Sequence, residues 1–260
     1  MNKTGIVVPC FNEAVRFPAV ALQEFEQAFQ SHPIRFIFVD DGSTDETRAL
    51  LQALVDRSGG RAELLGLDKN VGKAEAVRAG LRRAIDDGAE VVGYLDADLA
   101  TSITDLAKLL RVLADSSIQT VLGSRVQLLG KKIERKLWRH YLGRCFATLA
   151  SLVLRIPVYD TQCGAKVFRV SETLKSVLSE PFLTRWAFDI EILGRGLAGY
   201  PGVGRWEIRE LHENPLDRWV DRSGSKLSLF AMIRTAGELA LIESDLRLRR
   251  KKYARAEHRH

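Results

Sequence analysis

Strand and helix signals alternate through the first half of the chain. Short apolar runs that predict strands are each followed by a segment with helical periodicity. The predicted strands lie at 5–9, 35–40, 62–67, 91–96 and 120–125, and the predicted helices at 15–30, 45–57, 73–87 and 104–115. Alternation at this spacing predicts an α/β fold with a mostly parallel sheet and helices on both of its faces.

The second half of the chain is less regular. Residues 131–155 predict one long amphipathic helix with a basic side, and 226–248 predict a second one. Between them we expect helices near 171–179 and 185–197 and a strand near 207–214, and after them a basic, frayed end. Because no low-complexity linker separates these parts, we expect one domain over 1–225 with 226–260 as its extension.

Composition narrows the class of protein. The chain has 260 residues with a formal net charge of +6, which suits phosphate-bearing ligands or an anionic membrane surface. Its three scattered cysteines indicate neither a disulfide framework nor a metal site and fit a reducing, cytoplasmic compartment. The first apolar run is short enough to be a strand instead of a signal peptide, and no uncharged apolar stretch reaches the roughly 20 residues that span a bilayer.

Polar residues gather where the predicted strands end. They occupy 9–13, 40–45, 68–73, 96–98 and 123–125. Ligands of open α/β sheets bind outside the carboxyl ends of the strands, so we expect the functional site at this edge.

The segment GYLDADLA at 93–100 brings an apolar strand directly to Asp96 and Asp98. Two carboxylates this close repel each other, and burying them unpaired is costly. Either the pair caps a helix in solvent or a cation lies between the acids. A pair of carboxylate oxygens suits Mg²⁺ or Mn²⁺, which complete their coordination with phosphate oxygens and water.

Three other segments carry candidate nucleotide contacts. Asn12 and Glu13 follow the first strand, where they could cap the next helix or meet a ligand. Asp40 and Asp41 precede a glycine turn and could accept hydrogen bonds from a base or from ribose hydroxyls. Lys73, after Gly72, could meet a phosphate or simply begin a helix, but the spacing excludes a P-loop.

The motifs VVPCFNEA, VDDGSTDET, NVGKAEAVRAG, YLDADLA, LGSR, DTQCGAKVFR, RWAFDIEI and GSK together resemble glycosyltransferase family 2 over about residues 5–235. Within it the chain is most similar to the polyprenyl-phosphate sugar synthases of the dolichyl-phosphate β-glucosyltransferase type. The resemblance implies a Rossmann-like GT-A catalytic domain over 1–225. It also implies inverting, metal-dependent transfer of a sugar, with glucose expected, from a UDP-sugar to polyprenyl phosphate.

The same resemblance implies roles for individual residues. Pro9, Glu13, Asp40 and Lys73 match the nucleotide-binding part, and Asp96 and Asp98 match the metal and diphosphate motif. Arg125, Ser225 and Lys226 match positions near the donor pyrophosphate or the acceptor phosphate.

The acceptor side is more open. Asp160 and Asp189 are the candidate carboxylates near the acceptor. Asp160 could instead be a turn or cap residue, and Asp189 could instead be a structural acid within a helix. Arg135 and Arg139, one turn apart on the basic helix side, could meet lipid phosphate or only solvent. Membrane anchors typical of the family are missing, which favours a soluble hydroxyl acceptor as the alternative.

Two further alternatives differ in kind. A basic module that binds membranes or nucleic acid would leave the acidic strand ends unexplained, so we expect no nucleic-acid partner. A polymer-making role would require a Q-x-x-R-W motif, which is absent. We expect a cytoplasmic enzyme. Its two amphipathic helices either make peripheral contact with an anionic membrane or pack on the catalytic domain and leave the basic tail in solvent.

Overall fold

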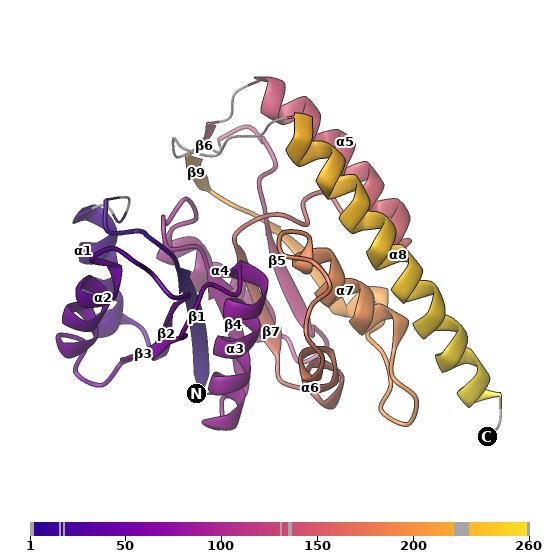
Figure 1. Cartoon of the computed structure of the whole chain (residues 1–260), viewed down its shortest axis with the longest axis horizontal. Coiled ribbons are helices and arrows are strands. Elements are labelled where there is room, and N and C mark those ends of the chain that lie inside the picture. Colours follow the sequence, from indigo (N-terminus) through magenta and orange to yellow (C-terminus); the bar gives the residue numbers. More distant parts are fainter. Residues whose placement is uncertain are drawn as a thin grey trace.

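The computed structural model describes residues 3–15, 17, 19–130, 132–134, 137–220 and 229–258; the side chains of 19–20, 132–134, 137–142, 220 and 229–236 are outside the description. Its centre is a seven-stranded sheet in the order β3-β2-β1-β4-β7-β5-β8 (Figure 1). The strands are β1 Thr4–Cys10, β2 Ile34–Asp40, β3 Ala62–Gly66, β4 Val91–Leu95, β5 Thr120–Ser124, β7 Ala165–Arg169 and β8 Leu211–Pro215.

The sheet is mostly parallel, as predicted. Only β7 runs against its neighbours, because it enters between β4 and β5 from the second half of the chain and pairs antiparallel with both. Its five residues are almost fully buried. The carboxyl ends of β1, β2, β4 and β5 therefore meet the amino end of β7, where the segment DTQCG arrives.

Helices cover both faces of the sheet, also as predicted. The helices of the first half are α1 Ala19–Ser31, α2 Thr47–Asp56, α3 Lys73–Asp86 and α4 Ile103–Leu113. Side chains alternate along the strands, so that Val7 lies in one core with α3, and Ile6 and Val8 lie in the other with α1, α2 and α4. Helices α6 Glu172–Ser179 and α7 Phe188–Ala198 complete the first of these cores.

The prediction of one helix over 131–155 is wrong at its start. Residues Lys132–Glu134 form strand β6, which pairs in parallel with β9, Arg218–Val220, and helix α5 spans Leu137–Leu154. The pairing partner lies more than 80 residues away, so local periodicity could not reveal it. The predicted strand at 207–214 starts late, because a 3₁₀ turn at Ile208–Glu210 precedes β8.

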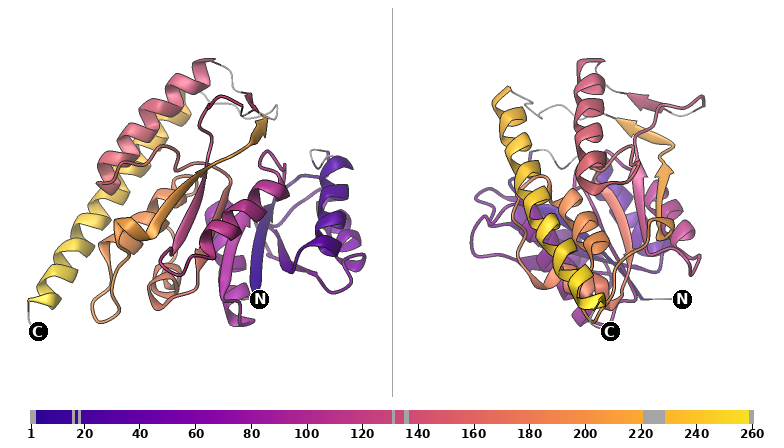
Figure 2. Two further views of the ribbon diagram at one scale, coloured as in Figure 1. Left: turned by 180° about the vertical axis from the view of Figure 1, so that it is seen from behind. Right: turned by 90° about the vertical axis from the view of Figure 1, so that its right-hand side faces the viewer.

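The C-terminal helix is longer than predicted. Helix α8 spans Leu229–Glu257, so the expected frayed end is helical almost throughout. Ion pairs one turn apart stabilise it, and Arg249 also pairs with Glu180 at the end of α6. It lies beside α5 and α7 (Figure 2). Within the ranges that the structure describes, none of the helices combines the length and apolar composition needed to cross a bilayer.

Candidate active site

The loops after β1 and β2 bind each other at the predicted edge. Asn12 adopts a left-handed backbone with φ 51°. Its side-chain Oδ1 accepts a hydrogen bond from the Thr44 N–H at 2.9 Å, and its own N–H donates to Ser43 Oγ. The Glu13 N–H donates to Thr47 Oγ1. Of the two readings that the sequence left open for these residues, helix capping does not hold, because α1 begins only at Ala19 and the two residues join two loops instead.

Pro9 and Asp40 lie at the ends of neighbouring strands. Pro9 is level with Val39 in the β1–β2 pairing, and Asp40 follows on β2. Asp40 is buried, and its Oδ1 accepts the Ser43 N–H at 3.1 Å, which closes the turn after the strand.

Asp41 organises the start of α3. Its two carboxylate oxygens accept the N–H groups of Val71 at 2.7 Å and Gly72 at 2.9 Å. Burial raises the pKa of Asp41, against the opposing effect of these two hydrogen bonds. Both oxygens are thus engaged by the chain, and Gly72 is held at φ +96° immediately before Lys73.

Lys73 meets the acidic end of β4. Its Nζ lies 2.6 Å from Asp96 Oδ1. Burial lowers the pKa of Lys73, but the charges of Asp96, Asp189 and Asp98 outweigh burial and raise it overall. Lys73 therefore places one positive charge against Asp96, and the negative charges around it keep it protonated.

Asp96 and Asp98 are shaped by a tight turn and by a neighbouring glycine. Asp98 Oδ1 accepts the Ala100 N–H, and Leu99, between Asp98 and Ala100, has φ 47°. Gly164 leaves the space that Asp96 uses: a Cβ at residue 164 would lie 2.2 Å from Asp96 Oδ2. Both aspartates remain partly exposed at the strand end.

This donor set fits Mg²⁺ or Mn²⁺. Two carboxylates supply hard oxygen ligands, and such ions commonly take the rest of their ligands from substrate phosphates and water. No group of three or more His, Cys, Asp and Glu side chains forms a metal cluster in the part of the chain that is described. A bound ion would therefore share its coordination with the ligand.

Arg125 and Asp160 form a rigid pair at the end of β5. Asp160 Oδ2 accepts from Arg125 Nε at 2.6 Å, and Oδ1 accepts from a second guanidinium nitrogen at 2.8 Å. Burial would raise the pKa of Asp160, but the charge and hydrogen bonds of Arg125 outweigh it and hold that pKa well below its usual range. Glu213 accepts the backbone N–H groups of Tyr159 and Asp160, which orders the loop.

Asp189 lies deeper, in the first turn of α7. It accepts hydrogen bonds from the Tyr94 hydroxyl and from Gln162 Nε2, and it forms an ion pair with Lys166. Burial raises its pKa. Gln162 and Lys166 belong to DTQCGAKVFR, a motif that the sequence singled out without assigning them a role.

Arg185 is another residue that sequence reasoning missed. It is exposed in the loop before α7, and its Nε would lie 3.0 Å from a Cβ at Gly72. Its charge also acts on Asp41 and lowers that pKa. The loop before α7 thus brings a cation over the predicted nucleotide side, a long-range contact that only the fold creates.

Four predicted phosphate contacts cannot be placed. Arg135, Ser225 and Lys226 lie outside the described residues, and Arg139 is described only as part of the α5 backbone.

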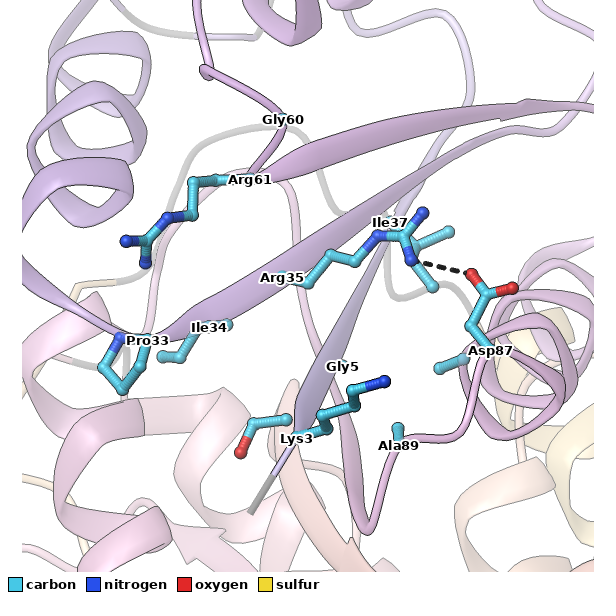
Figure 3. A pocket seen from close by; sticks show the side chains of 12 residues that line it. Lys3, Gly5, Pro33, Ile34, Arg35, Ile37, Gly60, Arg61, Asp87 and Ala89 are labelled. Atoms are coloured by element: carbon cyan, nitrogen blue, oxygen red, sulfur yellow. Dashed lines mark hydrogen bonds and ion pairs between the residues drawn. The ribbon is translucent and has the colours of Figure 1, made fainter. Parts of the chain in front are cut away.

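In the part of the chain that the structure describes, one cavity lies at the amino ends of the strands and another lies at their carboxyl ends. The larger, about 280 Å³, lies at the amino ends of β1 and β2, away from the site. Figure 3 shows Arg35 reaching across it to Asp87. The smaller, about 40 Å³, is lined by Arg125, Arg144 and Gln162, among others. The smaller one is connected to the acidic strand end through one loop, because Gln162 lines the cavity and Gly164, two residues later, accepts the Asp96 N–H.

Known proteins are similar to this chain in sequence and in architecture. The family described as "Glycosyl transferase family 2" matches residues 5–174. A dolichyl-phosphate beta-glucosyltransferase from Homo sapiens is 32% identical over 242 residues, which cover 88% of this chain and 71% of that protein.

Two solved structures share the fold. Mannosyl-3-phosphoglycerate synthase from Rubrobacter xylanophilus has a TM-score of 0.67 at 20% identity, over 97% of this chain and 76% of that one. Glucosyl-3-phosphoglycerate synthase from Mycobacterium tuberculosis, solved with Mn²⁺, UDP and phosphoglyceric acid, has a TM-score of 0.62 at 19% identity, over 93% and 78%. The chain therefore belongs to glycosyltransferase family 2 and is a glycosyltransferase with the GT-A fold.

Proposed function

We propose that this glycosyltransferase moves a glucosyl residue from a UDP-sugar to a polyprenyl phosphate, with inversion and with Mg²⁺ or Mn²⁺. The observation that carries the proposal is that acidic and basic side chains lie together at the carboxyl ends of the strands. Asp96 and Asp98 can hold a divalent ion there, and Arg125, locked by Asp160, presents a guanidinium beside a small cavity. The similarity to dolichyl-phosphate beta-glucosyltransferases supports the lipid-phosphate acceptor.

The donor half of the site lies between the loops after β1, β2 and β4. Asp40 and Glu13 lie at the ends of the loops that would receive the nucleoside. Lys73 and Arg185 supply cations around the Gly72 turn, where the diphosphate would lie. Hydrogen bonds to Asp41 keep this turn in place before any ligand arrives, which lowers the ordering cost of binding.

Transfer is a displacement at the anomeric carbon. The bond from that carbon to the diphosphate oxygen breaks, its electron pair leaves with the nucleoside diphosphate, and a new bond forms to the acceptor oxygen. A divalent ion held by Asp96 and Asp98 would neutralise charge on the leaving diphosphate. Lys73 adds a second positive charge close to the same place, which stabilises the transition state electrostatically.

A phosphate acceptor changes what the protein must supply. A phosphate monoester has its second pKa at about 6, so it is largely ionised at neutral pH and needs positioning more than proton removal. Arg125 suits that task because a guanidinium can bind phosphate with two hydrogen bonds, and Asp160 fixes its plane. Asp160 serves here as the positioning partner of Arg125, because its own low pKa makes it a poor base.

A hydroxyl acceptor is the second candidate. It would need a general base, and burial raises the pKa of Asp189 in the direction that such a base requires. Asp189 connects to the cavity beside Arg125 through Gln162, so it lies on the acceptor side in either case.

We also propose peripheral attachment to an anionic membrane through α5 and α8. Exposed leucines lie on both helices: Leu149 and Leu152 on α5, and Leu241 and Leu248 on α8. Exposed arginines accompany them, at Arg155 and Arg247. Apolar side chains in the headgroup region and basic residues near anionic lipid would hold the enzyme where a lipid phosphate is found.

A donor screen tests the function. The full chain is incubated with UDP-glucose, UDP-galactose, UDP-N-acetylglucosamine or GDP-mannose, with short-chain polyprenyl phosphate in detergent, and with or without Mn²⁺. We expect glucosylated lipid phosphate in the mass spectrum, dependent on the metal and absent for Asp98→Ala. Asp56→Ala, at the exposed end of α2, serves as the matched control and should retain activity. Transfer only to a hydroxyl acceptor such as a glycan would contradict the lipid assignment.

Vesicle sedimentation tests the attachment. Binding should appear with vesicles containing anionic lipid, decrease at high salt, and weaken for Leu241→Glu/Leu248→Glu and on deletion of 247–260. Val203→Glu, which changes an exposed apolar residue in the turn after α7, is the control and should bind normally. A protein that stays in the supernatant at low salt would refute this proposal and favour the soluble acceptor.

A further inference from the structure

A buried lysine lies beneath the acceptor side of the site. Lys166, the second residue of β7, is 0% exposed. Its Nζ donates to the Cys163 carbonyl at 2.7 Å and lies 2.7 Å from Asp189 Oδ1. A lysine is rarely fully buried without a partner, so its place in the central sheet requires an explanation.

The partner carboxylate is held from several directions. Tyr94 donates its hydroxyl to Oδ1, and Gln162 donates its amide to Oδ2 at 3.3 Å. Asp189 also belongs to the first turn of α7, where the helix dipole favours a negative charge. These contacts come from β4, from the loop before β7 and from β7 itself, so the orientation of Asp189 is set by the tertiary structure.

Burial acts against both charges of this pair. It raises the pKa of Asp189 and lowers that of Lys166. The 2.7 Å contact between the two groups acts in the opposite direction, because a nearby opposite charge favours the ionised form of each. The other titratable groups that act on the pair are Lys73 on α3, Tyr94 and Asp96 at the end of β4, and Asp160 and Cys163 in the loop before β7. Of these, Lys73 also favours the ionised form of Asp189.

We propose that Lys166 is a positioning residue that favours the ionised form of Asp189 and directs its carboxylate at the acceptor side of the site through their buried ion pair. The inference rests on the proposed function only for the role of Asp189 in transfer, which is that of the general base that a hydroxyl acceptor needs. Gln162 makes the connection to the acceptor, because it contacts Asp189 and lines the cavity beside Arg125. Lys166 does not touch that cavity, so it acts through Asp189.

If the ion pair between Lys166 and Asp189 served only the stability of the fold, its removal would have different consequences. A buried ion pair can often be replaced by apolar residues without loss of stability, whereas removing one partner leaves an isolated buried charge. Stability alone would therefore not distinguish the two roles, and the tests need a readout that depends on the charge of Asp189.

The first test uses the pH dependence of unfolding and needs no activity. In Lys166→Met, Asp189 loses its cation and its folded-state pKa lies further above the ordinary value. The free energy of unfolding should then fall, relative to wild type, as pH rises from about 4. In Asp189→Asn, Lys166 remains alone with a lowered pKa, so the difference from wild type should grow as pH falls from about 10. The double variant should show neither trend and should be more stable than Lys166→Met.

The second test uses the pH–rate profile. With a hydroxyl acceptor, for which Asp189 would be the general base, the acidic limb of kcat in Lys166→Met should shift to higher pH by about one unit or more, because a higher pH is needed to ionise Asp189. At about pH 6.5 this lowers kcat on the order of 10-fold, with partial recovery in more alkaline buffer. The donor KM should change little, since the nucleotide contacts are on other loops. In Asp189→Asn the added Lys166→Met change should cause no further loss.

Arg195→Met is the matched control. It removes another nearly fully buried cation, which belongs to α7 itself but pairs with Glu191 and binds the segment at 177–181 instead of Asp189. It should lower stability and leave the acidic limb unmoved. If the two single variants show the opposite pH trends in unfolding but the acidic limb of kcat in Lys166→Met does not move, the positioning role is wrong. If the pH trends in unfolding are absent, the ion pair itself is wrong. Failure of wild type to transfer any sugar would count against the proposed function alone.

Discussion

Gly164→Ala should disable the metal-binding end of β4 without touching a charged group. A Cβ at this position would lie 2.2 Å from Asp96 Oδ2 and 2.4 Å from Cγ. Ordinary contacts between such atoms are on the order of 3.5 Å, so about 1 Å of overlap must be relieved. Gly164 is not among the residues with positive φ, so alanine brings no backbone strain of its own.

The overlap has few ways to relax. The Asp96 N–H donates to the Gly164 carbonyl at 2.9 Å, which ties the two backbones together. The carboxylate must therefore rotate, and rotation moves Oδ1 from its 2.6 Å contact with Lys73. Displacing a side chain that orients a metal site typically lowers metal affinity 10- to 100-fold. We expect UDP affinity in the presence of Mn²⁺ to fall by this factor, about 1.4–2.7 kcal/mol.

Calorimetric titration with UDP, with and without Mn²⁺, measures this effect, and thermal unfolding verifies that the variant is folded. Gly237→Ala on α8 is the matched control, since the Cβ that alanine adds would meet no atom within 4 Å apart from the helix's own backbone. It should bind UDP normally and raise stability by up to about 1 kcal/mol. A folded Gly164→Ala protein that binds UDP and Mn²⁺ with wild-type affinity would refute the role of this contact.

Three further predictions concern other parts of the site and core. Asp40→Ala should weaken nucleotide binding on the order of 1–3 kcal/mol, raising donor KM more than it lowers kcat; a normal KM with a low kcat would contradict this. Because Arg125 lowers the pKa of Asp160, their pair stabilises the fold above about pH 4 and loses this contribution as pH falls, so Asp160→Asn should flatten acid denaturation curves. Arg195→Met should destabilise the fold by about 3–5 kcal/mol in urea unfolding, because Glu191 is left charged in the core.

The first half of the fold could be predicted because its signals are local. Each strand there is an apolar run, and each helix has its own period, as in α4, where Ser102 caps the first turn. Polar residues at the strand ends also predicted the edge of the site, since parallel strands place their carboxyl ends together. The same reasoning predicted Asp96 and Asp98 as metal ligands, and the structure places Lys73 beside Asp96.

The second half depends on contacts distant in sequence. Strand β6 was predicted as helix because Lys132–Glu134 continues a helical pattern, and only pairing with β9 makes it a strand. Arg185 reaches Gly72 across more than 100 residues, and no local pattern reports such a meeting. The position of β7 inside the sheet could not be predicted either, because an apolar run does not reveal its neighbours.

The sequence by itself determined the class of fold, the acidic strand end and the family, because hydrophobic period, turn residues and motif spacing are properties of the chain alone. The tertiary structure decided what each charge does. In the sequence, Asp160 and Asp189 were both candidates for the acceptor side. In the structure, Arg125 binds Asp160, whose pKa is lowered, whereas Asp189 is buried beside Lys166 and its pKa is raised. Burial and the distance to an opposite charge set the pKa of a carboxyl group, and both quantities exist only once the chain has folded.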